Sequence, residues 1–268
     1  MSGAAPLRVM TYNVRYAALD DGPRAWEHRR DAVASTARVH RPDVLCLQEV
    51  WQDQLPDLRE RLPGYEWAAE RQRTGEHTPV GYLPDRLAVE GMDVFALAPD
   101  PEDIGTVAWD AAVPRVATEV RFRDRRGDAT FDLVNVHFDH AGALARRESA
   151  RLVRERLAGS RALLVGDLNA RPASDPYRSL VGHPGPFADA RLVAETRFGP
   201  GETFVGFAGE GVEDGTEFAP TTGKRIDYVL VRGFDVDLYA TVADVDATWR
   251  HASDHLPVVA DLRPAIPD

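Results

Sequence analysis

Hydrophobic and polar residues alternate along much of the chain in short runs that are typical of β-strands. Helical spacing is clearest over 24–40 and 141–158, with shorter candidates at 51–61 and 174–181. Several predicted strands follow one another without a helix between them, which argues against a purely alternating parallel fold. We therefore expect an α+β fold with two packed mixed or antiparallel sheets flanked by helices. The predicted strands are 7–14, 43–48, 65–70, 79–83, 92–98, 113–123, 129–137, 161–166, 225–232, 235–243 and 256–262.

Polar side chains stand at the ends of five of these runs. Each lies directly after or before an apolar segment, so each is expected at the tip of a buried strand. Since strand ends meet at one edge of a sheet, the pattern predicts one polar site built from distant parts of the chain. These side chains are Asn13, Glu49, His137, Asp167 with Asn169, and Asp254 with His255.

This distribution predicts a single domain over residues 1–268, because dividing the chain would also divide the site. The N-terminus has no basic region followed by a long apolar stretch, and no run is long enough to cross a bilayer. We expect a cytoplasmic protein without a membrane span, and nothing points to an obligate protein partner. Cys46 is the only cysteine and lies in an apolar run, which excludes an intrachain disulfide and a thiolate metal cluster.

Four carboxylates would meet at the predicted edge: Glu49, Asp167, Asp227 and Asp254. Close carboxylates repel one another unless a positive charge lies among them. Oxygen and amide ligands without sulfur favour a hard cation, Mg²⁺ or Mn²⁺, which binds through a few carboxylates and through phosphate oxygens of a substrate. The pattern favours hydrolysis of a phosphoester over metal storage.

Asp227 interrupts the otherwise apolar run 225–231, and a buried charge needs a partner. His255 is the candidate partner, and such a pair provides a general base or a hydrogen-bond donor to developing charge. Arg115 is a candidate for binding phosphate, because a guanidinium matches it with two parallel hydrogen bonds.

Several of these residues also have ordinary structural explanations. Asn13 suits a turn, Glu49 suits the first turn of the helix predicted at 51–61, and the 253–255 segment suits a helix cap. A zinc site at His137 and His140 is a further alternative, although strand periodicity places positions 137 and 140 on opposite faces.

The chain has 43 acidic and 32 basic residues, a net charge of −11, and Lys224 is its only lysine. This acidity weakens the case for extensive binding to duplex nucleic acid, which relies on Lys and Arg neutralising phosphates. It does not exclude a nucleic-acid substrate.

Six segments, in this order along the chain, resemble the motifs of the endonuclease/exonuclease/phosphatase superfamily. They are Thr11-Tyr-Asn13, Leu47-Gln-Glu49, Asn135-Val-His137, Gly166-Asp167-Leu-Asn169, Arg225-Ile-Asp227-Tyr and Ser253-Asp254-His255. Further segments at 109–112, 137–142 and 202–204 are similar to a bacterial and archaeal branch of metal-dependent hydrolases.

The resemblance implies a four-layer αββα sandwich with the site at one edge of two packed sheets. It implies that Glu49 is the main metal ligand, with Asn13 and Asp254 beside it. Asp167 would orient or deprotonate the attacking water, and Asn169 would help to hold it and the phosphate.

The resemblance further implies that His255, paired with Asp227, acts as base or stabilises the transition state, and that His137 donates to a phosphate oxygen. The tyrosine that binds phosphate in abasic-site endonucleases has no clear counterpart here, and basic DNA-binding loops are not evident. The first hypothesis is therefore a phosphodiesterase or phosphatase, with a nuclease and a catalytically silent binding module as alternatives.

Overall fold

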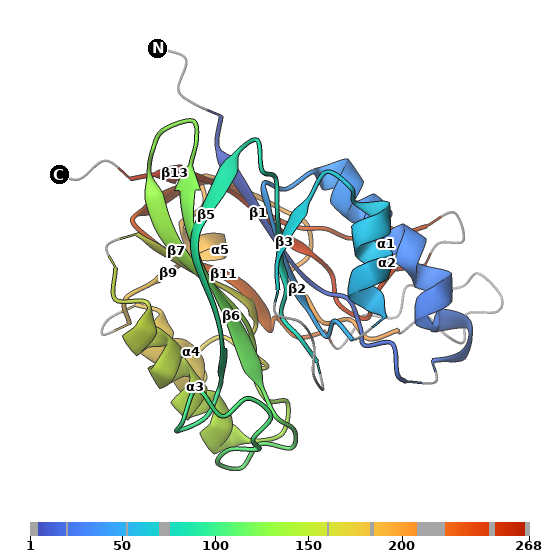
Figure 1. The fold of residues 1–268 in the computed structure, drawn as a ribbon, viewed down its shortest axis with the longest axis horizontal. Coiled ribbons are helices and arrows are strands. Elements are labelled where there is room, and N and C mark those ends of the chain that lie inside the picture. Colours follow the sequence, from blue (N-terminus) through green and yellow to red (C-terminus); the bar gives the residue numbers. More distant parts are fainter. Residues whose placement is uncertain are drawn as a thin grey trace.

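Two β-sheets pack face to face in the computed structural model, which describes residues 5–19, 21–51, 53–69, 76–159, 161–182, 185–207, 223–246 and 250–265 (Figure 1). The first sheet has seven strands, in the order β10 (Thr196–Phe198), β12 (Phe234–Thr241), β13 (Val258–Pro264), β1 (Leu7–Asn13), β2 (Val44–Gln48), β4 (Val80–Tyr82) and β3 (Glu66–Ala68). The second has six, in the order β5 (Leu87–Ala96), β6 (Val116–Asp124), β7 (Thr130–His137), β8 (Ala162–Asp167), β11 (Asp227–Arg232) and β9 (Ala188–Asp189).

Both sheets are mixed. In the first, β1 pairs in parallel with β2 and antiparallel with β13. In the second, β8 pairs in parallel with β7 and antiparallel with β11. The predicted α+β sandwich of two mixed sheets is confirmed.

Helices cover the outer faces of the sheets and complete the four layers (Figure 1). Helices α1 (Trp26–His40) and α2 (Gln54–Arg61) pack their apolar side chains against outward residues of β1 and β2. Helices α3 (Ala143–Arg156) and α4 (Asp175–Leu180) do the same against β7, β8 and β11. The short elements η1 (Gly22–Arg24) and α5 (Ala190–Val193) complete the described helices.

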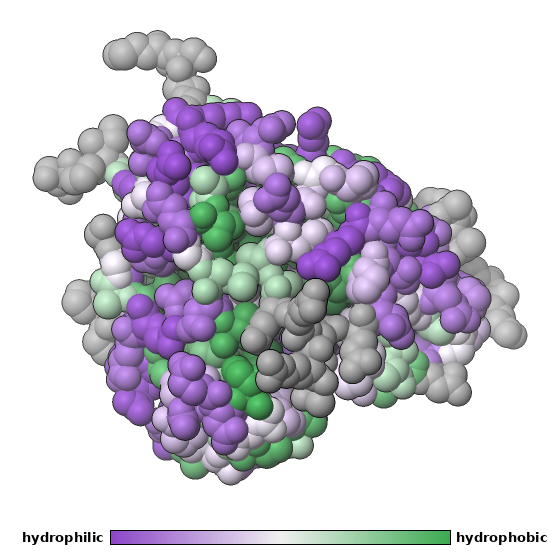
Figure 2. All heavy atoms as spheres, viewed as in Figure 1, coloured by the Kyte–Doolittle hydropathy of each residue, from purple (hydrophilic) through white to green (hydrophobic). Residues whose placement is uncertain are grey.

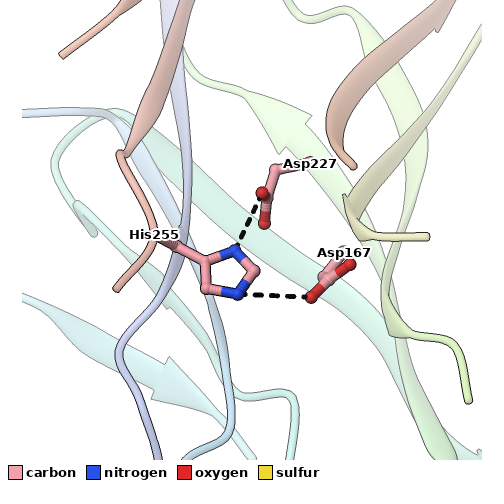
Figure 3. Close-up of side chains that lie close together, drawn as sticks. All are labelled: Asp167, Asp227 and His255. Atoms are coloured by element: carbon pink, nitrogen blue, oxygen red, sulfur yellow. Dashed lines mark hydrogen bonds and ion pairs between the residues drawn. The ribbon is translucent and has the colours of Figure 1, made fainter. Parts of the chain in front are cut away.

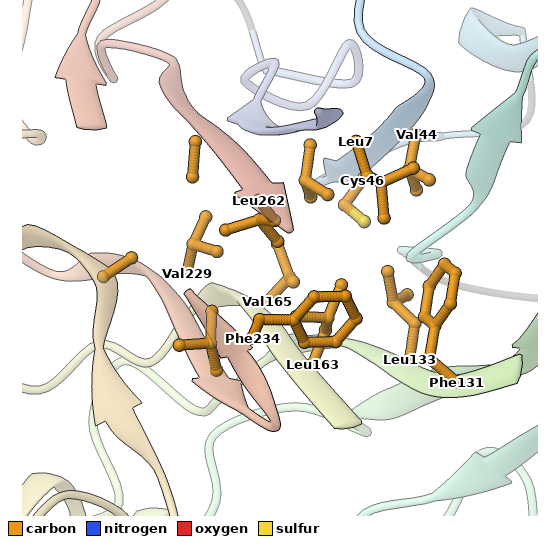
Figure 4. Close-up of a cluster of buried hydrophobic side chains, with 14 of the residues drawn as sticks. Leu7, Val44, Cys46, Phe131, Leu133, Leu163, Val165, Val229, Phe234 and Leu262 are labelled. Atoms are coloured by element: carbon orange, nitrogen blue, oxygen red, sulfur yellow. The ribbon is translucent and has the colours of Figure 1, made fainter. Parts of the chain in front are cut away.

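The central core lies between the sheets and is built from every second residue of the central strands (Figure 4). Successive side chains of a strand point to opposite faces, so Leu7 and Val9 of β1 face the second sheet while Met10 faces the helices. Leu163 and Val165 of β8 face back across the same core. This alternation also determines which polar residues at the strand ends point between the sheets.

The structure differs from the sequence-based prediction in its least periodic segments. Strand β5 begins at Leu87 rather than near residue 92, because its middle residues are exposed and carry no alternating apolar signal. The elements β9, β10 and α5 were not predicted, since each is only two to four residues long.

The surface is mainly hydrophilic on the face shown in Figure 2, where hydrophobic residues are exposed only in small patches. In the described part of the chain, no helix is both long enough and apolar enough to span a bilayer.

Candidate active site

The inner face of each central strand changes from apolar to polar at the same end of the sandwich. On β8 the inward series Leu163 and Val165 continues to Asp167. Strand pairing aligns His137 of β7 and Asp227 of β11 with Asp167. Three predicted catalytic side chains therefore lie side by side on the second sheet, because they occupy paired positions of neighbouring strands.

His255 precedes β13 of the first sheet and reaches across to this row (Figure 3). Its Nδ1 lies 2.9 Å from Asp227 Oδ2, and its Nε2 lies 3.8 Å from Asp167 Oδ2. The same Asp167 oxygen lies 3.5 Å from His137 Nε2 and accepts a hydrogen bond from Asn13 Nδ2 at 3.2 Å. Asp167 Oδ2 is thus the atom on which the predicted residues of both sheets converge.

Burial and neighbouring charges change the acidity of this cluster. Burial and then the charge of Asp227 raise the pKa of Asp167 to about 6, although His137 and His255 oppose the shift. Burial alone lowers the pKa of His255, but the charge and hydrogen bond of Asp227 outweigh it and raise this pKa to about 10. The two carboxylates beside the ring therefore favour the protonated form of His255.

The predicted metal ligands lie on the first-sheet side of the cluster. Glu49 follows β2, and its two oxygens accept hydrogen bonds from Asn13 Nδ2 at 2.9 Å and from the Tyr16 amide at 3.0 Å. Asp254 Oδ2 lies 3.3 Å from Arg15 Nη1, and burial, with the charge of Glu49, raises the pKa of Asp254. Arg15, which the sequence did not single out, brings a positive charge among these acidic groups.

Three non-glycine residues at this edge have left-handed backbones, with φ of 57° at Arg15, 59° at Glu49 and 45° at Asn169. Such conformations are unfavourable for residues with a Cβ and are often found where function requires a particular direction of the side chain. Asn169 donates its backbone N–H to Asp167 Oδ1 at 2.7 Å and its side-chain amide to the Phe138 carbonyl at 2.9 Å. It therefore holds the carboxylate of Asp167 in place.

Arg115 is buried beside His137, but its guanidinium is already engaged. It contacts Glu76 Oε2 at 2.7 Å, His137 Nδ1 at 2.9 Å and His140 Nδ1 at 3.0 Å. Asp139 Oδ2 lies 3.5 Å from its Nε. A guanidinium between the two histidines disfavours a shared zinc ion there, and it places Arg115 behind His137 rather than at the convergence point.

Two buried residues that support the site were missed by sequence analysis. Arg29 of α1 donates to the carbonyls of Val14, Arg15 and Ala252, which joins the segment after β1 to the segment before Asp254. Its position in a helix rich in arginine gave no sign of burial.

The other missed residue is Thr203, whose hydroxyl oxygen accepts hydrogen bonds from the amides of Ile226 and Asp227, both at 3.0 Å. The sequence marked 202–204 only as part of a family segment. A role of Thr203 in positioning Asp227 depends on contacts between residues more than 20 positions apart.

Donor atoms that can bind a divalent cation lie close together in this cluster. Within the described residues, one group of three acidic or histidine side chains has ligand atoms within 4.8 Å of one another: Asp167, Asp227 and His255. Asp227 Oδ1 is buried and has no hydrogen-bond partner, and a buried carboxylate oxygen usually has one. The site thus holds a buried cluster of carboxylate and imidazole groups of the kind that divalent cations bind.

The motifs and the sandwich together define a known class of hydrolase fold. The chain belongs to the Endonuclease/Exonuclease/phosphatase family, whose model matches residues 10–255, and members of this family hydrolyse phosphoester bonds. The family predicted from the sequence is confirmed.

Solved structures from Bacteroides are similar to this chain over nearly its whole length. A Bacteroides vulgatus endonuclease/exonuclease/phosphatase is 33% identical with a TM-score of 0.86, covering 97% of this chain and 100% of its own. A mannosyl-6-phosphatase from Bacteroides thetaiotaomicron is 30% identical with a TM-score of 0.84, covering 96% of this chain and 99% of its own. The human Nocturnin catalytic domain, at 20% identity and a TM-score of 0.69, shares the fold.

Two curated relatives match a shorter part of the chain. Nocturnin of Drosophila melanogaster is 26% identical over 178 residues, which are 59% of this chain and 26% of the relative. A protein of Acanthamoeba polyphaga mimivirus is 25% identical over 160 residues, 54% of this chain and 59% of the relative. The chain thus spans less than two thirds of the length of the curated relatives it matches.

Proposed function

We propose that this protein is a Mg²⁺- or Mn²⁺-dependent hydrolase that cleaves a phosphoester bond by attack of water. The observation that supports this most strongly is the convergence of His137, His255 and Asn13 on Asp167 Oδ2. A catalytically silent module would have no need to keep these buried polar groups together, since burying them costs free energy.

Glu49, with Asn13 and Asp254, would hold the cation at the first-sheet side of this point. A bound divalent cation supplies charge neutralisation for the phosphate and increases the acidity of a water molecule. Asn13 donates Nδ2 to both Glu49 and Asp167, which fixes these carboxylates, and its Oδ1, which accepts the Arg15 N–H at 3.1 Å, is the atom that would reach a cation.

The remaining steps are performed by side chains of the second sheet and by His255. Asp167, held by the Asn169 amide, orients the attacking water and takes its proton. The Nε2 atoms of His137 and His255 both lie near Asp167 Oδ2. From this position they donate hydrogen bonds to the phosphate oxygens as negative charge develops. Asp227 fixes the ring of His255 through Nδ1.

Arg115 acts as a positioning residue in this scheme. Together with Glu76 it contacts His137 Nδ1, so the opposite nitrogen of the ring faces Asp167. The phosphate-binding role predicted for Arg115 would thus be exercised through His137.

A sugar phosphate is the first substrate class to test, because a mannosyl-6-phosphatase is 30% identical over almost the entire chain. The net charge of −11 favours a small substrate over an extended nucleic acid, which requires many cationic contacts. A nuclease is therefore the second candidate.

The test is hydrolysis of a panel of sugar phosphates, nucleotides, phosphodiesters, phospholipid head groups, DNA and RNA with Mg²⁺ or Mn²⁺. We expect metal-dependent release that chelator abolishes, and a loss of at least about 100-fold in kcat for Glu49→Gln and His255→Gln. Glu60→Gln and His28→Gln are matched controls, because both side chains are more than half exposed. Absence of hydrolysis by the wild type, or full activity of Glu49→Gln, would refute the proposal.

A further inference from the structure

A groove of about 790 Å³ lies beside Asn169, a residue of the candidate active site. The beginning of α3, including Arg146, and residues between Ala170 and Pro176 before and at the start of α4 also line it. Its volume lies in the range of small-molecule sites. The part of a bound substrate that extends beyond Asp167 and the neighbouring carboxylates would enter this groove.

The groove carries positive charge that its own acidic residues do not neutralise by contact. Arg146 donates Nη1 to the backbone carbonyl of Asp139 at 2.8 Å, and no carboxylate in the described ranges forms an ion pair with it. Arg171, exposed two residues after Asn169, makes no hydrogen bond or ion pair through its guanidinium with any described residue. Two guanidinium groups are thus available beside a candidate catalytic residue.

Two acids, Asp110 and Asp175, also line the groove. The hydrogen bond from the Ala145 amide lowers the pKa of Asp110, and the charge of Arg146 contributes to this shift. Asp110 accepts hydrogen bonds from the amides of Leu144 at 3.1 Å and Ala145 at 2.7 Å, so its carboxylate compensates the positive N-terminus of α3. Arg147, the third arginine of the groove, lies 3.3 Å from Glu148. In a chain with a net charge of −11, two arginines left without an ion pair at this place favour an anionic ligand.

The apolar residues that line the groove limit the kind of carbon skeleton that can join this anionic group to the phosphate that is hydrolysed. Ala143, Leu144, Ala170 and Pro176 also line the groove. A carbon skeleton of the size of a sugar or a nucleoside suits such a surface, because its nonpolar faces are removed from water while its substituents reach the arginines.

We propose that the groove binds a second phosphate group, through Arg146 and Arg171, on a small substrate whose first phosphate lies at Asp167. The inference rests on the proposed function for the first phosphate. It adds that the preferred substrate carries two phosphates on one sugar-sized or nucleoside-sized skeleton.

The affinity for pairs of ligands that differ by one phosphate group tests the proposal without requiring turnover. Calorimetry on the His255→Gln protein with Mg²⁺ would compare fructose 1,6-bisphosphate with fructose 6-phosphate, and adenosine 3′,5′-bisphosphate with adenosine 5′-phosphate. We expect the Kd of the bisphosphate to be at least about tenfold lower in one or both pairs, as for one added charge-assisted contact. Preference in one pair identifies the skeleton, and preference in both identifies the second phosphate as the main determinant.

Arg171→Gln and Arg146→Gln, added singly, should each reduce this preference severalfold, and together they should remove it. Arg151→Gln is the matched control, because this exposed arginine is on the same helix but pairs with Glu148 and Glu155. Equal affinity for mono- and bisphosphates in both pairs, or a preference that persists in the double variant, would overturn the proposal. Failure of the proposed function would be seen separately, as absence of hydrolysis by the wild type.

Discussion

Buried hydrogen bonds of Asn135 link the two sheets next to the site, and removing them tests how the site is held together. Asn135 of β7 accepts a hydrogen bond from Gln48 Nε2 of β2 at 2.7 Å. Its own amide donates to the carbonyls of Leu47 at 2.8 Å and Thr78 at 3.0 Å. These residues are fully or almost fully buried, so water cannot replace the lost partners.

The perturbation is Asn135→Ala. Three buried hydrogen bonds at roughly 1 kcal/mol each, with a small cavity and a less satisfied Gln48 amide, predict a loss of about 3–4 kcal/mol in the free energy of unfolding. Urea unfolding at neutral pH, followed by tryptophan fluorescence, measures it. Thr196→Ala, exposed on β10, is the control.

A loss below about 1 kcal/mol would refute the reasoning, since that is the value of a single ordinary hydrogen bond. A double variant measures how much free energy of unfolding is lost when the Gln48 amide has no acceptor. Replacing Asn135 and Gln48 together by Leu and Met should destabilise the protein less than the sum of the single changes, because the hydrogen bond between these two side chains is counted in both single changes and no Gln48 amide is left without its acceptor.

Three further outcomes are expected. Gly166→Ala should cost several kcal/mol in unfolding free energy, because a Cβ at its φ of 133° would lie 2.1 Å from the Val136 carbonyl oxygen; urea unfolding would show a near-wild-type midpoint if this reasoning is wrong. Burial alone would raise the pKa of Glu76, but the hydrogen bond and charge of His137 lower it to about 2. Glu76 therefore stabilises the fold above about pH 4.5, and the stability difference between wild type and Glu76→Gln, roughly 2–3 kcal/mol, should disappear as the pH falls towards 2; a constant difference would contradict this. Glu49→Gln should weaken the binding of Mn²⁺ at least about tenfold in calorimetry, and unchanged affinity would remove Glu49 from the proposed ligands.

The candidate site was predicted where a polar residue interrupts or terminates a strongly apolar strand. Asp227 and His255 are such residues, and their pairing at 2.9 Å was expected because a buried carboxylate needs a partner. Asp167 and His137 were expected at strand ends, and the register of β7 and β8 places them side by side. Which nitrogen or oxygen atoms face one another could not be read from the pattern.

Arg115 shows where residue type alone was insufficient. A guanidinium suits phosphate, but it suits carboxylate and imidazole acceptors equally well. The turn after residue 137 brings Asp139 and His140 to Arg115, and Glu76 arrives from another loop, so the buried guanidinium is surrounded by acceptors of the chain itself. Their positions follow from loop conformations that have no periodic signal.

The pattern of apolar and polar residues predicted two packed sheets flanked by helices and the set of polar residues at the strand ends. It predicted Asp167 at the end of an apolar strand, and in the structure Leu163, Val165 and Asp167 lie on one face of β8. The contacts of Arg29 and Thr203, and the position of Arg146 and Arg171 along one groove, became visible in the tertiary structure. Their contacts join segments far apart along the chain, and such contacts depend on how the sheets and loops pack together rather than on any local pattern.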